Sequence, residues 1–401
     1  MIEIKDKSKC CGCSSCANIC PKQCINMSED TEGFLYPVVD KKKCIDCNLC
    51  INSCPELNLK EEKQFKQDGY LVQIKDDEIR KESTAGGAFT AIARFVIKNN
   101  GVVFGVTMDE NFYVHHTYVE REEGLAKFRN SKYVQSAVGE LTLKKVKEFL
   151  LQERLVCFSG TPCQIEGLKC FLKRDYENLI TVDVVCRAVP SPLVFRKYVE
   201  FQNKKLDSKI VSVRFRDKFY GYKYSTMNIK TLNNNGKYHK GIESDLWLRT
   251  FFSEICDRPS CHSCSFRKRY RESDFTIWDC FNVGSFSKKM DDDKGTTRML
   301  VNSEKGRNLF KDINEYINFE GVDSDKLVYG VKELTESVKP NRLRKEFMND
   351  LNILSTEKLF NKYFPNTMKV RVERVFRLTI YKLGIYSLIK NLYVKLKNKI
   401  K

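Results

Sequence analysis

Two cysteine runs with the same spacing lie in the first 55 residues. Each reads Cys-x2-Cys-x2-Cys-x3-Cys-Pro, at residues 10–21 and 44–55. A cubane iron–sulfur cluster needs four thiolates at tetrahedral corners, and this spacing supplies them for a pair of [4Fe–4S] clusters, with the fourth cysteine of each run crossing to the other cluster. We therefore predict that Cys10, Cys13, Cys16 and Cys54 bind one cluster, and that Cys44, Cys47, Cys50 and Cys20 bind the other.

The alternative for these runs is structural zinc. Zinc sites usually pair two Cys-x2-Cys knuckles and do not place a third cysteine at the same step, so the spacing favours iron. The duplicated run also predicts a pseudo-two-fold ferredoxin fold, with residues 32–39 as a short β segment between the halves.

A third group of cysteines lies near the middle of the chain. Cys256, Cys261 and Cys264 include one Cys-x2-Cys pair, which alone fits a zinc knuckle, a redox dithiol or half of a cluster. Cys163 and Cys186 lie at or just past the carboxyl ends of predicted strands, the edge where open α/β sheets bind ligands. Combined with the pair at Cys261 and Cys264, they make four thiolates for a third cubane. The remaining cysteines without ligand spacing are predicted to be small buried hydrophobes: Cys11, Cys24, Cys157 and Cys170.

The chain between the cysteine groups alternates predicted strands and helices, which indicates an α/β layer. Strands are expected at residues 70–74, 102–108, 114–120, 155–159 and 179–186, and helices at 83–99 and 138–153. Ser83 or Thr84 is expected to cap the first helix. The paired glycines Gly86 and Gly87 suit close approach to a phosphate, although a plain capped helix explains them equally well. Residues 209–241 look antiparallel, with a hairpin turn at 233–236.

The composition points to a reducing compartment and to acidic partners. The chain has 401 residues and 18 cysteines, and begins without an apolar leader, which favours metal ligands in the cytoplasm over disulfides. No stretch is apolar enough to span a bilayer. The formal charge of +18 favours an acidic electron carrier, anionic lipid or nucleic acid. Residues 291–293, three aspartates, are predicted to form a solvated loop.

Half of the net positive charge lies in the last 36 residues, which hold ten Lys or Arg and one acid, Glu373. Apolar residues recur there at helical spacing between the basic ones. Such a helix either lies on an anionic membrane surface or packs on its own domain or a partner. No nucleic-acid recognition motif is evident, so nucleic acid is not an expected partner.

Taken together, these motifs resemble the coenzyme F420 hydrogenase/dehydrogenase beta subunit family over residues 1–330. Besides the cysteines, the matching segments are residues 83–89, 131–136, 160–164, 185–191 and 273–279. The resemblance implies an iron–sulfur flavoprotein with FAD in the α/β domain. It also implies that Cys163, Cys186, Cys261 and Cys264 bind the third cluster, with Cys256 and Cys280 as competitors. The implied flavin-site residues are Gly86, Gly87, Ser131, Lys132 and Tyr133.

We therefore expect a multidomain α/β oxidoreductase that passes electrons between a ferredoxin-like carrier and an organic substrate through the clusters and FAD. The alternative is a non-catalytic subunit that feeds a separate reductase. The expected domains are a ferredoxin module (1–60), two parts of the flavin domain (61–160 and 161–330, the second with the third cluster) and a helical basic tail (331–401). The expected location is cytoplasmic, with peripheral contact at the inner membrane face. Residues 187–188 and 279–282 depart from the family pattern, so the deazaflavin coenzyme does not follow as substrate.

Overall fold

The computed structural model describes residues 1–233, 238–386 and 389. Its N-terminal module has one short helix in each cysteine run, α1 (Ser15–Ile19) and α2 (Leu49–Asn52). Between the runs, β1 (Ile25–Glu29) pairs antiparallel with β2 (Leu35–Val39). The β segment expected between the two runs is therefore confirmed as the second strand of a hairpin.

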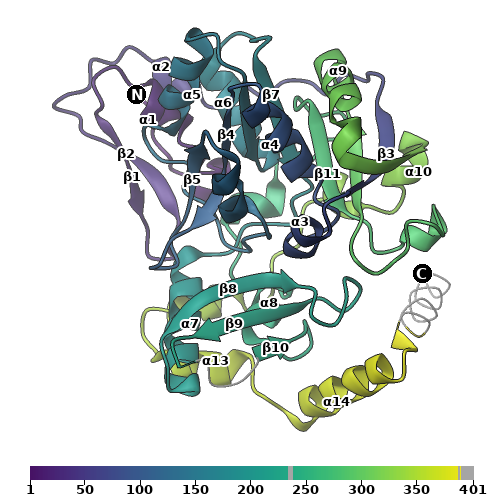
Figure 1. Cartoon of the computed structure of the whole chain (residues 1–401). Helices are drawn as coiled ribbons and strands as arrows, with labels where there is room; N and C mark the ends of the chain where they lie inside the picture. Colours follow the sequence, from purple (N-terminus) through teal and green to yellow (C-terminus); the bar gives the residue numbers. More distant parts are fainter. Residues whose placement is uncertain (234–237, 387–388, 390–401) are drawn as a thin grey trace.

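One eight-stranded mixed sheet forms the centre of the molecule (Figure 1). Its strand order is β13-β3-β12-β11-β7-β6-β4-β5. The four strands β11, β7, β6 and β4 run parallel to one another, and antiparallel strands extend the sheet at both edges. The strands are β3 (Asp68–Ile74), β4 (Val102–Met108), β5 (Val114–Val119), β6 (Val156–Gly160), β7 (Leu179–Val184), β11 (Phe275–Asp279), β12 (Thr297–Val301) and β13 (Ile317–Val322).

Helices cover both faces of this sheet because its central strands are apolar on both sides. In β6, Cys157 points to one core, while its neighbours Val156 and Phe158 point to the other, as the two-residue period of a strand requires. The first core packs under α4 (Ala88–Lys98) and α9 (Glu304–Asp312), and the second under α5 (Thr142–Leu151) and α6 (Pro162–Leu172). The predicted α/β layer is confirmed.

A second lobe carries a three-stranded antiparallel sheet, ordered β10-β9-β8. Its aromatic core includes the fully buried Trp247 and Phe195. The strands and helices are β8 (Ile210–Asp217), β9 (Thr226–Thr231), β10 (Tyr238–Lys240), α7 (Pro192–Leu206), α8 (Leu246–Phe252), α12 (Arg344–Asp350) and α13 (Thr356–Tyr363). The expected hairpin turn at 233–236 falls largely outside the described residues.

The remaining helices are short or peripheral: α3 (Asp77–Glu82), α10 (Ser324–Val328), α11 (Lys332–Thr335) and α14 (Met368–Lys382). Figure 1 shows α14 extending away from the main body beneath the second lobe. The part of the predicted tail helix after residue 389 lies outside the described residues. None of the described helices is both long and apolar enough to cross a membrane.

Two expectations about helix starts were wrong. Gly87, with φ of +83°, is the N-cap of α4, while Ser83 ends the preceding α3. A Cβ at Gly87 would lie 2.7 Å from the Ile74 side chain, so the turn needs glycine for both conformation and space. The helix expected at 138–153 is shorter, because it begins at Thr142.

The domain boundary predicted at residue 160 falls between β6, a central strand of the main sheet, and α6, a helix that packs on that sheet. Both predicted parts of the flavin domain therefore contribute strands to one sheet.

Candidate iron–sulfur centres and cavity

The first thiolate group, which we call the outer site, consists of Cys20, Cys44, Cys47 and Cys50. All four line one small hollow at the surface, together with Cys24. Cys47 is exposed and Cys44 half-buried. The sulfur of Cys24 lies 3.4 Å from that of Cys20, so this cysteine, expected to be simple packing, is a fifth thiol at the site.

The second group, the middle site, consists of Cys10, Cys13, Cys16 and Cys54. Burial raises the pKa of Cys16, and the nearby thiols of Cys10 and Cys54 raise it further. Burial also raises the pKa of Cys54, with a smaller contribution from Cys10. Cys16 and Cys54 share one apolar cluster with Cys20 and Cys50 of the outer site, so the outer and middle sites adjoin.

The third group, the inner site, consists of Cys163, Cys186, Cys261 and Cys264. Cys163 lies in the first turn of α6, and Cys186 follows β7. Cys261 lies in a 3-10 helix (Pro259–Ser263) that ends at Cys264.

Electrostatic coupling shows that these thiols lie together. Burial raises the pKa of Cys186 to about 12; Arg267 opposes the rise, and the thiols of Cys163 and Cys264 add to it. Burial likewise raises the pKa of Cys261, and Cys186 is the next contributor.

The two competing cysteines lie elsewhere in the fold. Cys256 is fully buried in the aromatic core of the second lobe, and Cys280 is fully buried in an apolar cluster with Leu71 and Leu300. The fold thus separates both from the four thiols of the inner site.

The middle and inner sites touch through Cys11. Its thiol lies within hydrogen-bonding reach of Cys163 and raises the pKa of that residue, with burial as the next cause. Cys11 and Cys13 pack in one cluster with Cys163 and Cys264. On the facing helix, a Cβ at Gly167 would lie 2.7 Å from the Cys13 Cβ and 2.9 Å from its sulfur. A glycine in α6 therefore permits this close contact.

Arg258 joins the same two sites from within the protein. It is fully buried. Its guanidinium donates to the Cys10 carbonyl at 2.7 Å, to Gln135 at 2.9 Å and to the Leu35 carbonyl at 2.9 Å, and its Nη2 lies 3.6 Å from the Cys10 sulfur.

Within the described chain, no carboxylate forms an ion pair with Arg258. A buried charge is costly without a counter-charge. Burial lowers the pKa of Arg258, but Cys10, Tyr36, Cys11 and Cys261 outweigh it and raise the pKa overall. The thiols of the two sites are therefore its electrostatic partners.

The donor sets fit iron–sulfur clusters, because each site offers four cysteine sulfurs and such clusters are held by thiolates. Among the described residues, no three or more His, Cys, Asp or Glu side chains converge as the ligands of one ion would. A cubane is larger than a single ion and holds its cysteine sulfurs farther apart.

A cavity of about 1180 Å³ opens at the carboxyl ends of the parallel strands. Residues at the ends of β6, β7 and β11 line it, as do the first residues of α4, and α8 and α14 close the opposite side. Cys186 belongs to this lining. The inner site thus borders the cavity directly, at the edge where open α/β sheets bind ligands.

Four of the five predicted flavin-site residues line the cavity: Gly87, Ser131, Lys132 and Tyr133. Gly86 lies behind the wall, where its N–H donates to the Thr297 hydroxyl at 2.9 Å. Lys132 donates to the carbonyls of Lys127 and Arg129, at 2.8 and 3.0 Å. Burial lowers the pKa of Lys132 to about 7, with Arg214 as the second cause.

Tyr133 forms part of the aromatic wall. Its ring stacks on Phe251 with centroids 4.4 Å apart, and its hydroxyl accepts a hydrogen bond from Arg216 at 3.0 Å.

The cavity wall is rich in hydrogen-bond donors without acceptors. Four buried donor atoms of lining residues have no partner in the described structure: Arg129 Nε, Arg216 Nη2, Arg298 Nε and Trp278 Nε1. The lining contains seven Lys or Arg but three acids. Unpaired buried donors are costly, so this wall fits a ligand rich in acceptor oxygens, such as a diphosphate.

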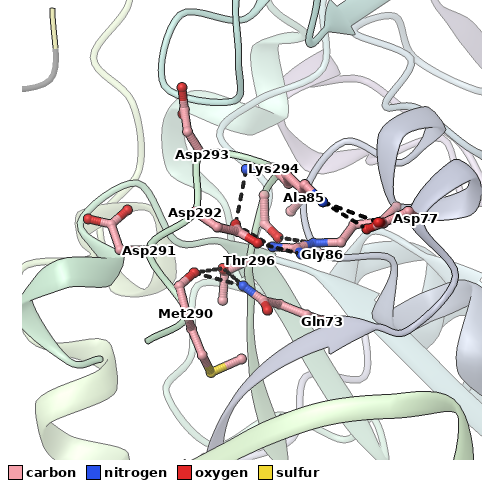
Figure 2. A network of polar contacts seen from close by, with 12 residues as sticks. Gln73, Asp77, Ala85, Gly86, Met290, Asp291, Asp292, Asp293, Lys294 and Thr296 are labelled. Carbon is pink, nitrogen blue, oxygen red and sulfur yellow. Dashed lines mark hydrogen bonds and ion pairs between the residues drawn. The ribbon is translucent and has the colours of Figure 1, made fainter. Parts of the chain in front are cut away.

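The aspartates at 291–293 are held by polar contacts next to this wall, and Figure 2 shows those of Asp292. Asp292 pairs with the buried Arg80 at 2.6 Å, and Asp291 pairs with Lys223 at 2.7 Å. Gln73 donates to the Met290 carbonyl and the Thr296 hydroxyl, as Figure 2 shows. The predicted loop is confirmed and Asp292 is exposed, but ion pairs also hold these aspartates, so the loop fastens α3 and the turn before α4.

Two protein-family models match parts of this chain. Residues 9–57 match the model of the 4Fe-4S dicluster domain. Residues 153–325 match the model of the C terminus of the coenzyme F420 hydrogenase/dehydrogenase beta subunit. No curated protein matches the chain.

Among solved structures, the F420-reducing [NiFe] hydrogenase complex from Methanosarcina barkeri contains a similar chain. The two are 17% identical, and the match covers 77% of this chain and 95% of that one with a TM-score of 0.46.

Proposed function

We propose that this chain is an iron–sulfur oxidoreductase related to the coenzyme F420 hydrogenase/dehydrogenase beta subunits, whose C-terminal model matches residues 153–325, and that electrons pass through it from a 4Fe–4S dicluster domain at residues 9–57. In the proposal the outer and middle sites bind the two clusters of the N-terminal module, the inner site binds a third, and the cavity binds FAD. When bound, the clusters supply one-electron transfer and the flavin supplies hydride chemistry.

The observation that carries the proposal is the order of the sites. Cys47 of the outer site is exposed, the middle site adjoins both others, and Cys186 of the inner site lines the cavity. The side chains thus form an unbroken series from the surface to a cavity large enough for a cofactor and a substrate. The residues of the series come from the proposed module at 1–60 and from the proposed flavin-domain parts at 61–160 and 161–330.

The cavity residues support FAD as the occupant. Gly87 places the start of α4 at the cavity, where backbone N–H groups suit a phosphate, and the unpartnered guanidinium donors of Arg216 and Arg298 suit its oxygens. Lys132, Ser131 and Tyr133 would hold the rest of the cofactor. The organic substrate would enter the remaining space, next to the flavin ring.

The surface around the outer site supports a ferredoxin-like acidic carrier as the external partner. Lys22, Lys41, Lys42 and Lys43 are exposed beside the cysteines of this site. Exposed apolar side chains lie among them at Val38 and Ile45, which are 55% and 57% accessible. A basic patch with apolar residues at its centre steers and holds an acidic partner.

We also propose peripheral contact with an anionic membrane through the C-terminal region, for a protein that works in the reducing cytoplasm. The outward face of α14 supports this contact, because Met368, Val372 and Leu383 are 70%, 61% and 65% accessible there. An exposed apolar stripe on a basic helix is typical of an interfacial segment.

Anaerobic purification followed by iron, sulfide and flavin analysis tests the redox proposal. We expect about twelve irons per chain, four for each cubane, together with one flavin, and reduction of a small acceptor by the chain alone. The double variant Arg216→Gln/Arg298→Gln should lose flavin and keep its iron. Clusters without flavin in the wild type would favour the non-catalytic electron-transfer role, and colourless or zinc-loaded protein would overturn both.

A further inference from the structure

A second concave site lies on the far side of α14 from the cavity. It is a groove of about 360 Å³ between α14 and the second lobe. Apolar residues from α7, α8, α13 and α14 line its walls, among them Phe201, Phe360 and Leu378. The same lining contains five basic residues and no carboxylate: Lys205, Lys240, Arg249, Arg371 and Arg374.

Within the described residues, none of these five cations forms an ion pair; Arg249 alone donates side-chain hydrogen bonds, and its acceptors are neutral carbonyls. Arg249 donates to the carbonyls of Phe364 and Pro365, at 3.0 and 3.3 Å. Burial lowers the pKa of Lys240, and Lys205 and Arg374 lower it further, while Asp245 opposes them. Positive charges therefore repel one another here, and an anion in the groove would relieve that repulsion.

The groove continues into the outward face of α14. At 100° per residue, the helix presents Arg371 and Arg374 to the groove, and Met368, Val372 and Leu383 to solvent on the adjoining face. Val375 belongs to both, since it lines the groove and is 64% accessible. Cations that flank an exposed apolar stripe fit a ligand with an anionic head and an apolar body.

We propose that this groove binds the phosphate headgroup of an anionic membrane lipid while the outward face of α14 lies in the bilayer surface. The inference rests on the membrane contact proposed above and adds a specific headgroup site to it. Lys205, Lys240, Arg371 and Arg374 surround the phosphate, and the apolar walls of the groove contact the glycerol and upper acyl chains. The contiguity of groove and stripe favours a lipid over a soluble phosphate.

Co-sedimentation of the full chain with vesicles tests the proposal. The vesicles are phosphatidylcholine with or without phosphatidylglycerol, and the groove variant is Lys240→Gln/Arg374→Gln. Each basic residue near an anionic surface contributes a factor of about five in binding, so the groove variant should bind the phosphatidylglycerol vesicles about thirty-fold more weakly. The matched control, Lys144→Gln/Lys147→Gln on the remote helix α5, removes the same charge and should bind like the wild type.

Two further arms separate the possible failures. The stripe variant Val372→Asp/Leu383→Asp should lose vesicle binding, and all variants should keep their iron content, because the groove lies apart from the thiolate sites. Equal binding by the groove variant and the wild type would overturn the headgroup site while leaving the membrane contact standing. No vesicle binding by the wild type would overturn both the headgroup site and the membrane contact, while the redox proposal would be unaffected.

Glycerol phosphate distinguishes the source of the anion. In one reaction Lys240 is acylated with glycerol phosphate present and no vesicles; in the other, with phosphatidylglycerol vesicles present. Equal protection of Lys240 in both would make the groove a site for a soluble phosphate, and the lipid assignment would be wrong. Protection by the vesicles alone supports the lipid.

Discussion

The outer and inner thiolate sites each offer four cysteine sulfurs, but in opposite surroundings. The outer site lies at the surface with Cys47 exposed, exposed lysines precede Cys44 at 41–43, and its four cysteines come from one short module. The inner site is assembled from α6, the end of β7 and the segment at 256–264, and Arg258 and Arg267 lie around it. Under the proposed electron route this contrast corresponds to a division of roles, in which the outer site would exchange electrons with a partner and the inner site with a flavin in the cavity.

The strongest test of this contrast removes an inner ligand. In Cys261→Ser we expect iron to fall from about twelve to about eight per chain, because a cubane needs four thiolates. Iron and sulfide analysis of anaerobic protein measures the loss. The half-buried Cys170→Ser is the control and should keep all its iron; an undiminished count in Cys261→Ser would remove the third cluster from the proposal.

Reversing charge beside the outer site should slow entry of electrons without changing the clusters. In Lys41→Glu/Lys42→Glu, we expect reduction by an acidic ferredoxin to be about tenfold slower at low salt, because the patch no longer attracts the partner. Stopped-flow absorbance gives the rate, and the difference should shrink as salt screens the charges.

The pair Lys288→Glu/Lys289→Glu, exposed and not part of the outer-site lining, serves as the matched control for charge. If it slows reduction as much as the first pair, the effect comes from net charge, and the outer site has no special role as the entry point.

Replacing Arg258 tests whether its positive charge raises the midpoint potential of the neighbouring clusters. A positive charge favours the reduced, more negative form of a centre, so Arg258→Met should lower a midpoint potential by about 60 mV, equivalent to a tenfold change for one electron. Arg258→Lys keeps the charge and should recover part of the shift. Redox titration followed by electron paramagnetic resonance measures both; unchanged potentials in a well-folded Arg258→Met protein would make the residue purely structural.

The smallest expected effect concerns the fifth thiol of the outer site. Cys24→Ser should retain about twelve irons, since the ferredoxin spacing already supplies four ligands without it. The same analysis of iron and sulfide applies. A loss of about four irons would mean that Cys24 is a cluster ligand in place of one of the predicted four, most directly its neighbour Cys20.

The N-terminal module was predictable from cysteine spacing because its ligand pattern is local: a loop that wraps a cubane has a fixed step between cysteines. The α/β layer was also predictable, since alternation of strands and helices is a local periodicity. Cys11 has no such spacing, and only tertiary packing brings it to Cys163. Cys24 lies four residues from Cys20, but this step is not part of the ligand pattern, so the spacing did not mark it as a thiol at the site.

Arg258 was missed for the same reason. Nothing beside it in the sequence marks a charged residue that will be fully buried between two thiolate sites, 248 positions away from Cys10. The aspartates at 291–293 form the predicted loop, but their partners Arg80 and Lys223 could not be foreseen from the polar run alone. In both cases the partner lies far away along the chain.

Gly167 is a modest feature with a large consequence. Because Gly167 has no side chain, the N-terminal loop that contains Cys13 can pack directly on α6. In the proposed electron route, a methyl group at this position would push the Cys13 loop away from α6 and lengthen the distance between the middle and inner sites. Electron transfer between the two clusters would then be slower even though every proposed ligand is still present.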